Sequence, residues 1–217
     1  MGTTISIYNP ALFEVLDTAT ETRYYGTDQN WFKTWWQRYT GCGPSVASNL
    51  VFYRMRRADA TAATAPIPRE RLLSLMEDVW EYVTPTRRGI PTTKLFRDLF
   101  ENYAEKKGIR VETCDVLDFC DETGTACNPP ALDDVAAFLE KALSTDHPVA
   151  FLNLCNGHEA NLDEWHWVTV VSMRYDPEDG RAVIGILDEG EHKEIDLALW
   201  LRTTKRGGGF VYFSLAA

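Results

Sequence analysis

The hydrophobic pattern divides the chain into a helical first half and a strand-rich second half. Apolar residues recur at helical spacing in the first half, and the second half contains short apolar or alternating runs bounded by turn residues. The predicted helices are 46–57, 69–83, a segment capped by Thr92 or Thr93 and closed by Gly108, 132–143 and 195–201. The predicted strands are 109–116, 149–154, 166–175, 182–187 and 210–215. Helices followed by strands with helical insertions indicate an α+β domain, a helical half packed beside an antiparallel sheet.

The strands 166–175 and 182–187 are joined by a strong turn signal, Asp-Pro-Glu-Asp-Gly at 176–180. In an antiparallel hairpin around that turn, the numbers of paired residues sum to about 355 to 357. His166 then faces residues 189–191, and a bulge or a tighter turn brings Asp188 level with it. Glu189 and Glu191 compete with Asp188 for the same position.

The start of the helix over 46–57 is the strongest chemical signal in the chain. It follows Gly41-Cys42-Gly43-Pro44, which places Cys42 just before or at the first helical residue. The helix start carries partial positive charge, which favours a thiolate, and the two glycines keep bulk away from the sulfur. Gln37, five residues upstream, can offer a side-chain N–H to a developing oxyanion. The pattern is typical of an activated cysteine nucleophile.

A thiolate nucleophile is usually paired with a histidine that accepts and returns the proton. The chain has four histidines, and His166 opens the apolar strand of the predicted hairpin, where a rigid scaffold holds it at the edge of a cleft. We therefore predict His166 as the base and Asp188 as the carboxylate that orients it. The other histidines are His147, His158 and His192.

The aromatic residues between 31 and 36 form a second conspicuous cluster: Trp31, Phe32, Trp35 and Trp36. Their spacing favours packing beneath the loop that carries Gln37, and the alternative is that one or two of them line a substrate groove. The N-terminal 30 residues show only a short helical turn near 10–16. The segment 58–68, rich in Ala, Thr and Pro, is expected to be a surface loop.

Composition narrows the classes of function. The 217 residues, 45% of them hydrophobic, suit a single packed domain, and a net charge of −10 argues against nucleic acid as the main partner. We expect no export signal and no membrane span, hence a cytoplasmic protein. Five cysteines do not form a disulfide framework, although a bridge between Cys120 and Cys127 is possible.

Two other chemistries find little support in the spacing of the residues. Cys155, His158, Asp163 and His166 lack the paired spacing of a structural zinc site, and there is no metalloprotease helix. The glycine run 207–209 does not follow a strand and open a helix as a phosphate loop does; it is expected to be a hinge or turn. We predict no metal and no cofactor.

Taken together, these segments resemble the papain-like cysteine peptidase superfamily, and most closely its bacterial branch related to the bacteriocin leader peptidases (peptidase family thirty-nine-like domains). The similar pieces are Gln37 to Pro44, His166 to Val171, and Asp188 at the end of the next strand. The resemblance covers about residues 37–57 and 148–190; residues 1–36 and 58–130 are unmatched, the latter as an insertion before the histidine strand. The Gln37–Cys42 spacing is one residue shorter than in many relatives.

The resemblance implies a single papain-like domain over 1–217 that cleaves a peptide or another amide through a thioester. It implies Cys42 as nucleophile, His166 as base and acid, Asp188 as orienter, and Gln37 with the Cys42 backbone N–H as oxyanion donors. We expect Gly41, Gly43, Trp165 and Trp167 to contact substrate. Two alternatives remain: an acyltransferase that uses the same thioester, and a binding module that kept the fold without turnover.

Overall fold

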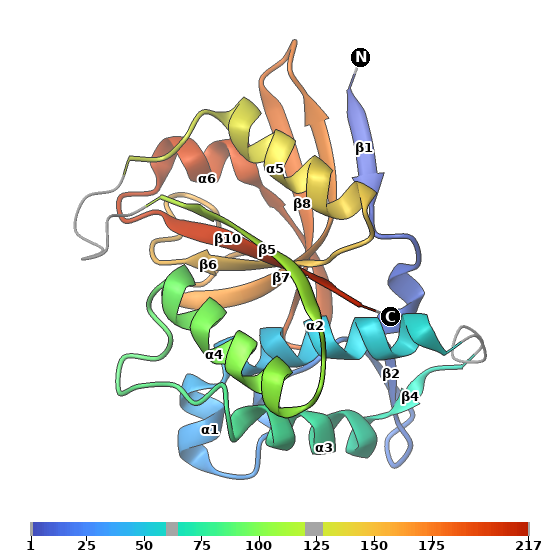
Figure 1. Cartoon of the computed structure of the whole chain (residues 1–217). Helices are drawn as coiled ribbons and strands as arrows, with labels where there is room; N and C mark the ends of the chain where they lie inside the picture. Colours follow the sequence, from blue (N-terminus) through green and yellow to red (C-terminus); the bar gives the residue numbers. More distant parts are fainter. Residues whose placement is uncertain (1, 60–64, 120–127, 217) are drawn as a thin grey trace.

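The computed structural model describes residues 2–59, 65–119 and 128–216, and it is an α+β fold as predicted (Figure 1). The helices are α1 (Trp35–Thr40), α2 (Cys42–Ala58), α3 (Arg69–Trp80), α4 (Thr93–Lys106), α5 (Leu132–Ser144) and α6 (Leu197–Thr203), with 3-10 turns η1 (Pro10–Phe13) and η2 (Gln29–Trp31). The strands are β1 (Thr3–Ser6), β2 (Glu14–Asp17), β3 (Thr22–Tyr25), β4 (Ile67–Pro68), β5 (Val111–Asp118), β6 (Val149–Asn153), β7 (His166–Asp176), β8 (Arg181–Asp188), β9 (Glu191–Asp196) and β10 (Gly208–Leu215).

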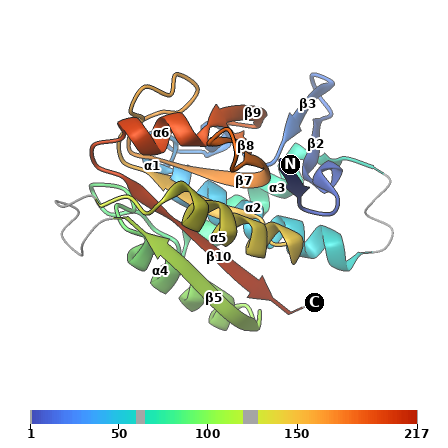
Figure 2. The same ribbon diagram turned by 90° about the horizontal axis from the view of Figure 1, so that it is seen from above.

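The large sheet is antiparallel throughout, in the order β5-β10-β6-β7-β8-β9, and β1 also pairs with β7. A second, small sheet has the order β3-β2-β4. Figure 2 shows β2 and β3 on the opposite side of the molecule from α4 and β5. The small sheet, β1 and β9 were not predicted, because their strands are short and carry little periodicity.

Helices cover both faces of the large sheet. Figure 1 shows α5 and α6 above it and α2, α3 and α4 below it. The residues of β6 alternate between the two resulting cores: Val149 and Phe151 belong to the upper one, Ala150 and Leu152 to the lower one. A strand buried on both faces has no polar side, which explains why 149–154 is apolar throughout.

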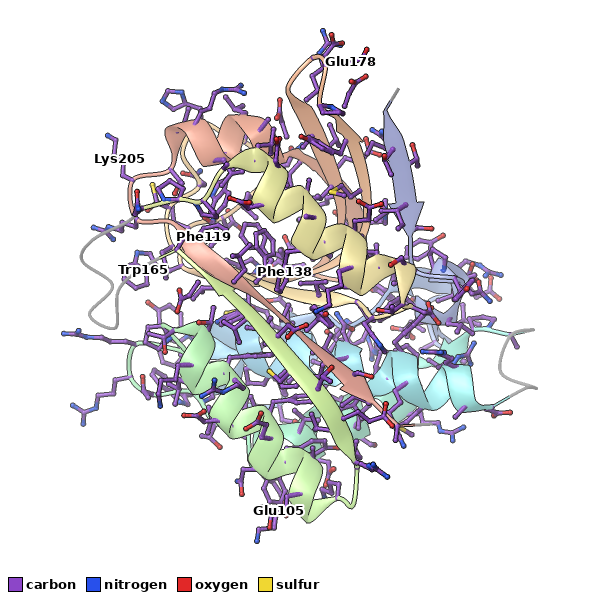
Figure 3. The ribbon with its side chains drawn as sticks, turned by 45° about the horizontal axis from the view of Figure 1, so that its top comes forward. Glu105, Phe119, Phe138, Trp165, Glu178 and Lys205 are labelled. Atoms are coloured by element: carbon purple, nitrogen blue, oxygen red, sulfur yellow. The ribbon has the colours of Figure 1, made fainter. Side chains whose placement is uncertain are left out.

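The upper core is rich in aromatic rings. Phe119 and Phe138 project into the layer between α5 and the sheet (Figure 3) and contact Phe210 of β10, with ring centroids 5.6 and 6.4 Å away. Fully burying a side chain of this size contributes about 2 kcal/mol. On the other face of the sheet, the first residue of β7, His166, lies beside Cys42 at the start of α2.

The β7–β8 hairpin has the predicted register. Tyr175 pairs with Ala182, and a bulge between Val170 and Ser172 shifts the pairing so that Thr169 faces Leu187. Continuing that register puts Asp188 opposite Val168, so Asp188 and His166 are diagonal neighbours on the sheet. Diagonal pairs lie within reach of long or ring side chains.

Two sequence expectations need correction here. The run 207–209 is no hinge, because Gly208 and Gly209 begin β10; a Cβ on Gly208 would lie 1.7 Å from the Leu152 carbonyl oxygen, so glycine is required by the closeness of β6. Ile195 lies in β9, and the last predicted helix begins only at Leu197, after the Asp196 cap. The possible Cys120–Cys127 bridge lies outside the described residues.

In the described part of the chain, no helix combines the length and the apolar character needed to cross a bilayer.

Candidate active site

Cys42 is the first residue of α2, as predicted. Gly41 joins α1 to α2 with helical backbone angles (φ −81°, ψ −2°), and no side chain caps the start of α2. The first hydrogen bond of the new helix runs from Ser45 N–H to the Gly41 carbonyl at 2.9 Å. The half-buried, free thiol of Cys42 therefore lies at the positive end of a helix of 17 residues.

The structure brings His166 and Asp188 together, as the hairpin register suggested. Nε2 of His166 lies 2.6 Å from Oδ1 of Asp188, and both side chains are almost fully buried. The second carboxylate oxygen of Asp188 accepts a hydrogen bond from Lys193 Nζ at 2.9 Å. The Asp188 carboxylate thus bridges the imidazole and an ammonium group.

The Cys42 side chain also interacts with the imidazole. Because Asp188 occupies Nε2, Nδ1 is the ring nitrogen left available to the sulfur. Burial lowers the pKa of His166, but the hydrogen bond to Asp188 and the interaction with Cys42 favour the charged ring and raise its pKa to about 10. Burial raises the pKa of Asp188, and its bonds to His166 and Lys193 outweigh that effect and lower it. Both shifts favour a cationic ring beside an anionic carboxylate.

A cavity of about 620 Å³ opens directly beside this group. Its lining includes Cys42 and His166, with residues from the end of α1, the loop before α4, the end of β6 and the loop before β7. A cleft of this volume is large enough for a short peptide segment or a ligand of similar size. A second, much smaller space behind the sulfur is lined by Cys42, His166 and Asp188 together.

Gln37 is not beside the thiol, contrary to the prediction. Its Oε1 accepts from the Thr34 N–H at 3.0 Å, completing a capping box at the start of α1, and its Nε2 donates to Glu77 at 2.7 Å. Both ends of the amide are occupied, and Gln37 lines neither space beside Cys42. Gln37 fixes α1, which leads into the Cys42 helix, and it is not an oxyanion donor in this arrangement.

Gln29, and not Gln37, is the glutamine that lies beside the Cys42 thiol. It is the first residue of η2, held by Asp28, and it lines both spaces beside Cys42. Its Oε1 is buried and has no hydrogen-bond partner among the described residues. An unpartnered buried amide is costly unless something pairs with it. Spacing did not reveal Gln29, because it lies thirteen positions before the cysteine and only the fold of η2 onto α2 brings it near.

The two glycines flanking Cys42 serve packing and do not line the cleft. A Cβ on Gly41 would lie 2.4 Å from the Gln37 carbonyl oxygen and 2.8 Å from the Phe32 ring. A Cβ on Gly43 would lie 2.7 Å from the Ile90 side chain. The prediction that Gly41 and Gly43 contact substrate is therefore not supported, because both glycines pack closely against other parts of the protein.

The predicted tryptophans both line the cleft, in different ways. Trp167 is buried, donates from Nε1 to the Ile90 carbonyl at 2.7 Å and stacks on Phe96, so it forms the floor. Trp165 is 50% exposed at the rim, with the Arg206 guanidinium 5.3 Å from its ring centroid.

The aromatic cluster of 31–36 divides in the same way. Phe32 is buried against Trp80, and Trp31 packs edge-on to Tyr24. Trp35, in contrast, is 67% exposed and stacks on Tyr39, which lines the cleft. The predicted packing is therefore confirmed for Phe32 and Trp31, whereas none of the four cluster residues lines the cleft itself.

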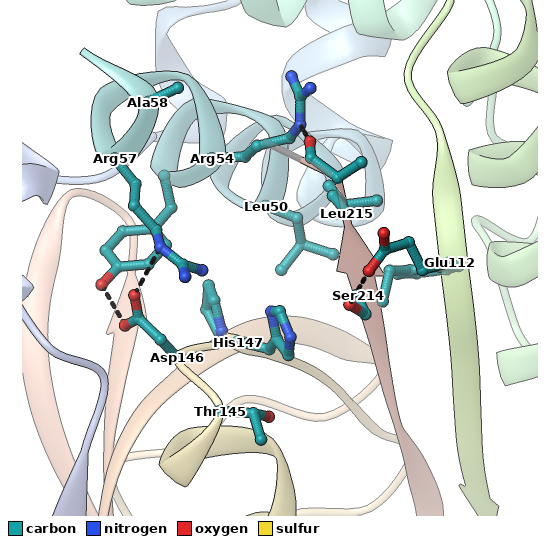
Figure 4. Close-up of a pocket in the computed structure, with 14 residues that line it drawn as sticks. Leu50, Arg54, Arg57, Ala58, Glu112, Thr145, Asp146, His147, Ser214 and Leu215 are labelled. Carbon is teal, nitrogen blue, oxygen red and sulfur yellow. Dashed lines mark hydrogen bonds and ion pairs between the residues drawn. The ribbon is translucent and has the colours of Figure 1, made fainter.

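None of the other three histidines lines either space beside Cys42. His158 lines a separate hollow with Cys155, and His192 lies on β9, opposite Leu187. His147 lines a cavity of about 340 Å³ at the far end of α2 (Figure 4), where burial and the nearby Arg57 lower its pKa. The described residues contain no group of three or more His, Cys, Asp or Glu side chains that would hold a metal ion.

Comparison with known proteins finds no family model that matches this chain and no curated protein similar to it in sequence.

Proposed function

We propose that this protein is a cysteine-dependent hydrolase of papain-like fold that cleaves a peptide or another amide through a thioester. The observation that carries the proposal is one imidazole that is hydrogen-bonded to a buried carboxylate and interacts with a helix-start thiol, beside an open cleft. The cationic ring favours a neighbouring thiolate by opposite charge. The papain-like assignment is supported by the nucleophile helix packing on the strand that carries the histidine.

In the proposed reaction, the Cys42 thiolate attacks the substrate carbonyl and a C–S bond forms as the carbonyl oxygen becomes an oxyanion. The Cys42 N–H, as expected from the resemblance, and Gln29, through its amide N–H₂, donate to that oxygen. His166 gives its proton to the leaving amine as the C–N bond breaks, which leaves a thioester.

Water then completes the cycle. Neutral His166 takes a proton from the water that attacks the thioester, and the carboxylic acid leaves as the thiolate is restored. Asp188 keeps Nε2 bonded throughout, so the ring stays oriented with Nδ1 toward the sulfur and the substrate. An acyltransferase would differ only in replacing this water with an amine or thiol.

The first test is the alkylation rate of Cys42 by iodoacetamide from pH 4 to 9, mapped by mass spectrometry with Cys114 and Cys155 as internal references. A cationic imidazole partner favours the nucleophilic thiolate by opposite charge, so Cys42 should label faster than the reference thiols near pH 6. Labelling of Cys42 at the same pH and no faster than the reference thiols would overturn the proposal and favour a binding module.

A further inference from the structure

The walls of the cleft beside Cys42 differ in chemistry from its floor. The floor is apolar and is made by Ile90, Pro91, Leu152, Leu154 and Trp167. The rim carries polar and charged groups: Tyr39, Arg87, Arg88, Glu164 and Trp165. A ligand that fills this cleft therefore meets apolar surface below and charge at the edge.

The two arginines stand on a rigid turn. Thr86 and Gly89 exchange backbone hydrogen bonds of 3.0 Å in both directions, and the Thr86 hydroxyl bonds both the Gly89 carbonyl and the Arg88 N–H. Gly89 supplies the positive φ of 73° that closes the turn. The turn thus presents both side chains to solvent at the cleft edge while its backbone is fixed.

Neither guanidinium has a protein partner: within residues 2–59, 65–119 and 128–216, no hydrogen bond or ion pair joins Arg87 or Arg88 to an acidic side chain. Elsewhere the pattern is different, since Arg23, Arg69 and Arg174 each pair with a carboxylate. Arg87 and Arg88 place two positive charges side by side in a chain of net charge −10. They produce a local positive field at the cleft, which attracts carboxylates, and their planar N–H groups can bind carboxylate oxygens in pairs.

The rim also carries one acidic residue. Glu164 precedes Trp165 in the chain, and it lines both this cleft and the neighbouring hollow, which Lys205 and Arg206 also line. An acidic group of a ligand is therefore attracted to Arg87 and Arg88 and repelled by Glu164.

We propose that the cleft accepts peptides with an apolar side chain on the floor and an acidic side chain beside it, held by Arg87 and Arg88. This inference rests on the proposed function of Cys42, because it assigns the substrate class of the same site.

The first experiment compares two reagents of similar size, iodoacetate and iodoacetamide, in their rates of alkylating Cys42. In both reactions a C–S bond forms, the C–I bond breaks and iodide leaves; only the charge of the reagent differs. The ratio of the two rates cancels the reactivity of the thiolate. In the R87Q/R88Q variant the ratio of iodoacetate to iodoacetamide should fall about tenfold at low salt, and the difference should shrink near 1 M salt.

A matched control removes two exposed arginines elsewhere, R110Q/R181Q. Arg110 follows α4, whose end is marked by Glu105, and Arg181 adjoins the hairpin turn marked by Glu178; both labels lie far from Trp165 in Figure 3. The control has the same net charge as the test variant, so its ratio should match the wild type. A loss of preference equal in the two variants would assign the effect to overall charge and overturn the inference.

The second experiment uses two peptidyl chloromethyl ketones that differ only in one residue, Glu or Lys, next to a leucine. The Glu reagent should inactivate Cys42 faster, and R87E/R88E should reverse the order. Rapid labelling without any preference between the reagents, or with a preference unchanged by R87E/R88E, would reject the acidic substrate and leave the hydrolase intact. A Cys42 that reacts no faster than Cys114 with any reagent would reject both.

Discussion

The two ends of helix α2 carry similar parts in different arrangements. Each end has a cavity, a histidine and a buried aspartate: His166 and Asp188 at the Cys42 end, His147 and Asp146 at the Ala58 end. At the Cys42 end the histidine bonds the aspartate directly and its pKa is raised. At the far end the histidine ring stacks on Tyr212 and burial lowers its pKa.

The difference lies in how each aspartate is used. Asp146 accepts from the Tyr53 hydroxyl at 2.6 Å and the Tyr8 N–H at 2.7 Å, and it pairs with Arg57 at 3.0 Å (Figure 4), so it fastens the N-terminal segment and α2 to the sheet. Asp188 gives one oxygen to an imidazole and leaves that ring's other nitrogen for the thiol. At the Cys42 end a thiol, an imidazole and a carboxylate line one space together, whereas none of the described residues that line the cavity beside His147 is a cysteine.

The sharpest test of this comparison replaces each histidine in turn with alanine. His166→Ala should lower Cys42 alkylation at pH 6 by about 100-fold, because the imidazolium that supports the thiolate is gone. His147→Ala should leave the rate unchanged. The rates are measured by mass spectrometry with each variant's fold confirmed by circular dichroism. Equal effects of the two changes would contradict the assignment of His166.

The two glutamines form a second pair. Gln29→Ala should slow acylation by p-nitrophenyl acetate about 100-fold while alkylation, which forms no oxyanion, stays near the wild-type rate. Gln37→Ala should keep the acylation rate and lose about 1 kcal/mol of unfolding free energy with its capping box. The rates come from p-nitrophenolate release, and the stabilities from denaturant unfolding. A slow Gln37 variant with a normal Gln29 variant would restore the prediction made from spacing.

Asp188→Asn should lower Cys42 alkylation at pH 7 by about tenfold. Without the carboxylate the pKa of His166 falls, and each unit of that fall shifts the equilibrium tenfold from the imidazolium–thiolate pair toward the neutral ring and thiol.

The raised pKa of His166 also makes the stability of the protein depend on pH. A raised folded-state pKa stabilises the protein below the unfolded value of about 6.5 and loses that contribution as pH rises toward about 10. The fall in unfolding free energy between pH 6.5 and 10 should therefore be smaller in Asp188→Asn than in the wild type.

Asp146→Ala should act on stability alone. It leaves the buried Tyr53 hydroxyl without its acceptor and is expected to cost about 2 kcal/mol, with alkylation of Cys42 retained. Denaturant unfolding measures the loss. A variant with normal stability and slow alkylation would mean that the far end of α2 communicates with the thiol.

The smallest effect is expected at Lys193. Lys193→Met removes one of the two hydrogen bonds to Asp188 and should lower alkylation at pH 7 only about threefold, because the bond to His166 persists. The acid limb of the rate profile should move slightly toward higher pH. Lys205→Met, near the hollow of Cys155, is a charge-matched control and should leave the profile in place.

Much of the fold could be predicted from the sequence, because local signals such as periodicity and helix caps agree with the tertiary structure. The helix that starts at Cys42, the Thr92 cap of α4 and the apolar β6 follow from periodicity and caps. The small sheet did not, because β2 and β3 are four residues each and are stabilised by partners distant in sequence. The predicted hairpin register was confirmed, and a bulge is present, but it leaves Asp188 diagonal to His166 and does not bring it level.

The sequence by itself determined that Cys42 opens a helix and that His166 and Asp188 lie near each other, because both follow from short-range patterns: a helix start and a hairpin register. Only the tertiary structure decided which glutamine approaches the sulfur. Gln37 is nearer to Cys42 along the chain, but helix capping and Glu77 hold its amide elsewhere, and the turn η2 delivers Gln29 instead. Distance along the chain predicts contacts within one element, whereas the approach of separate elements is set by how the whole core packs.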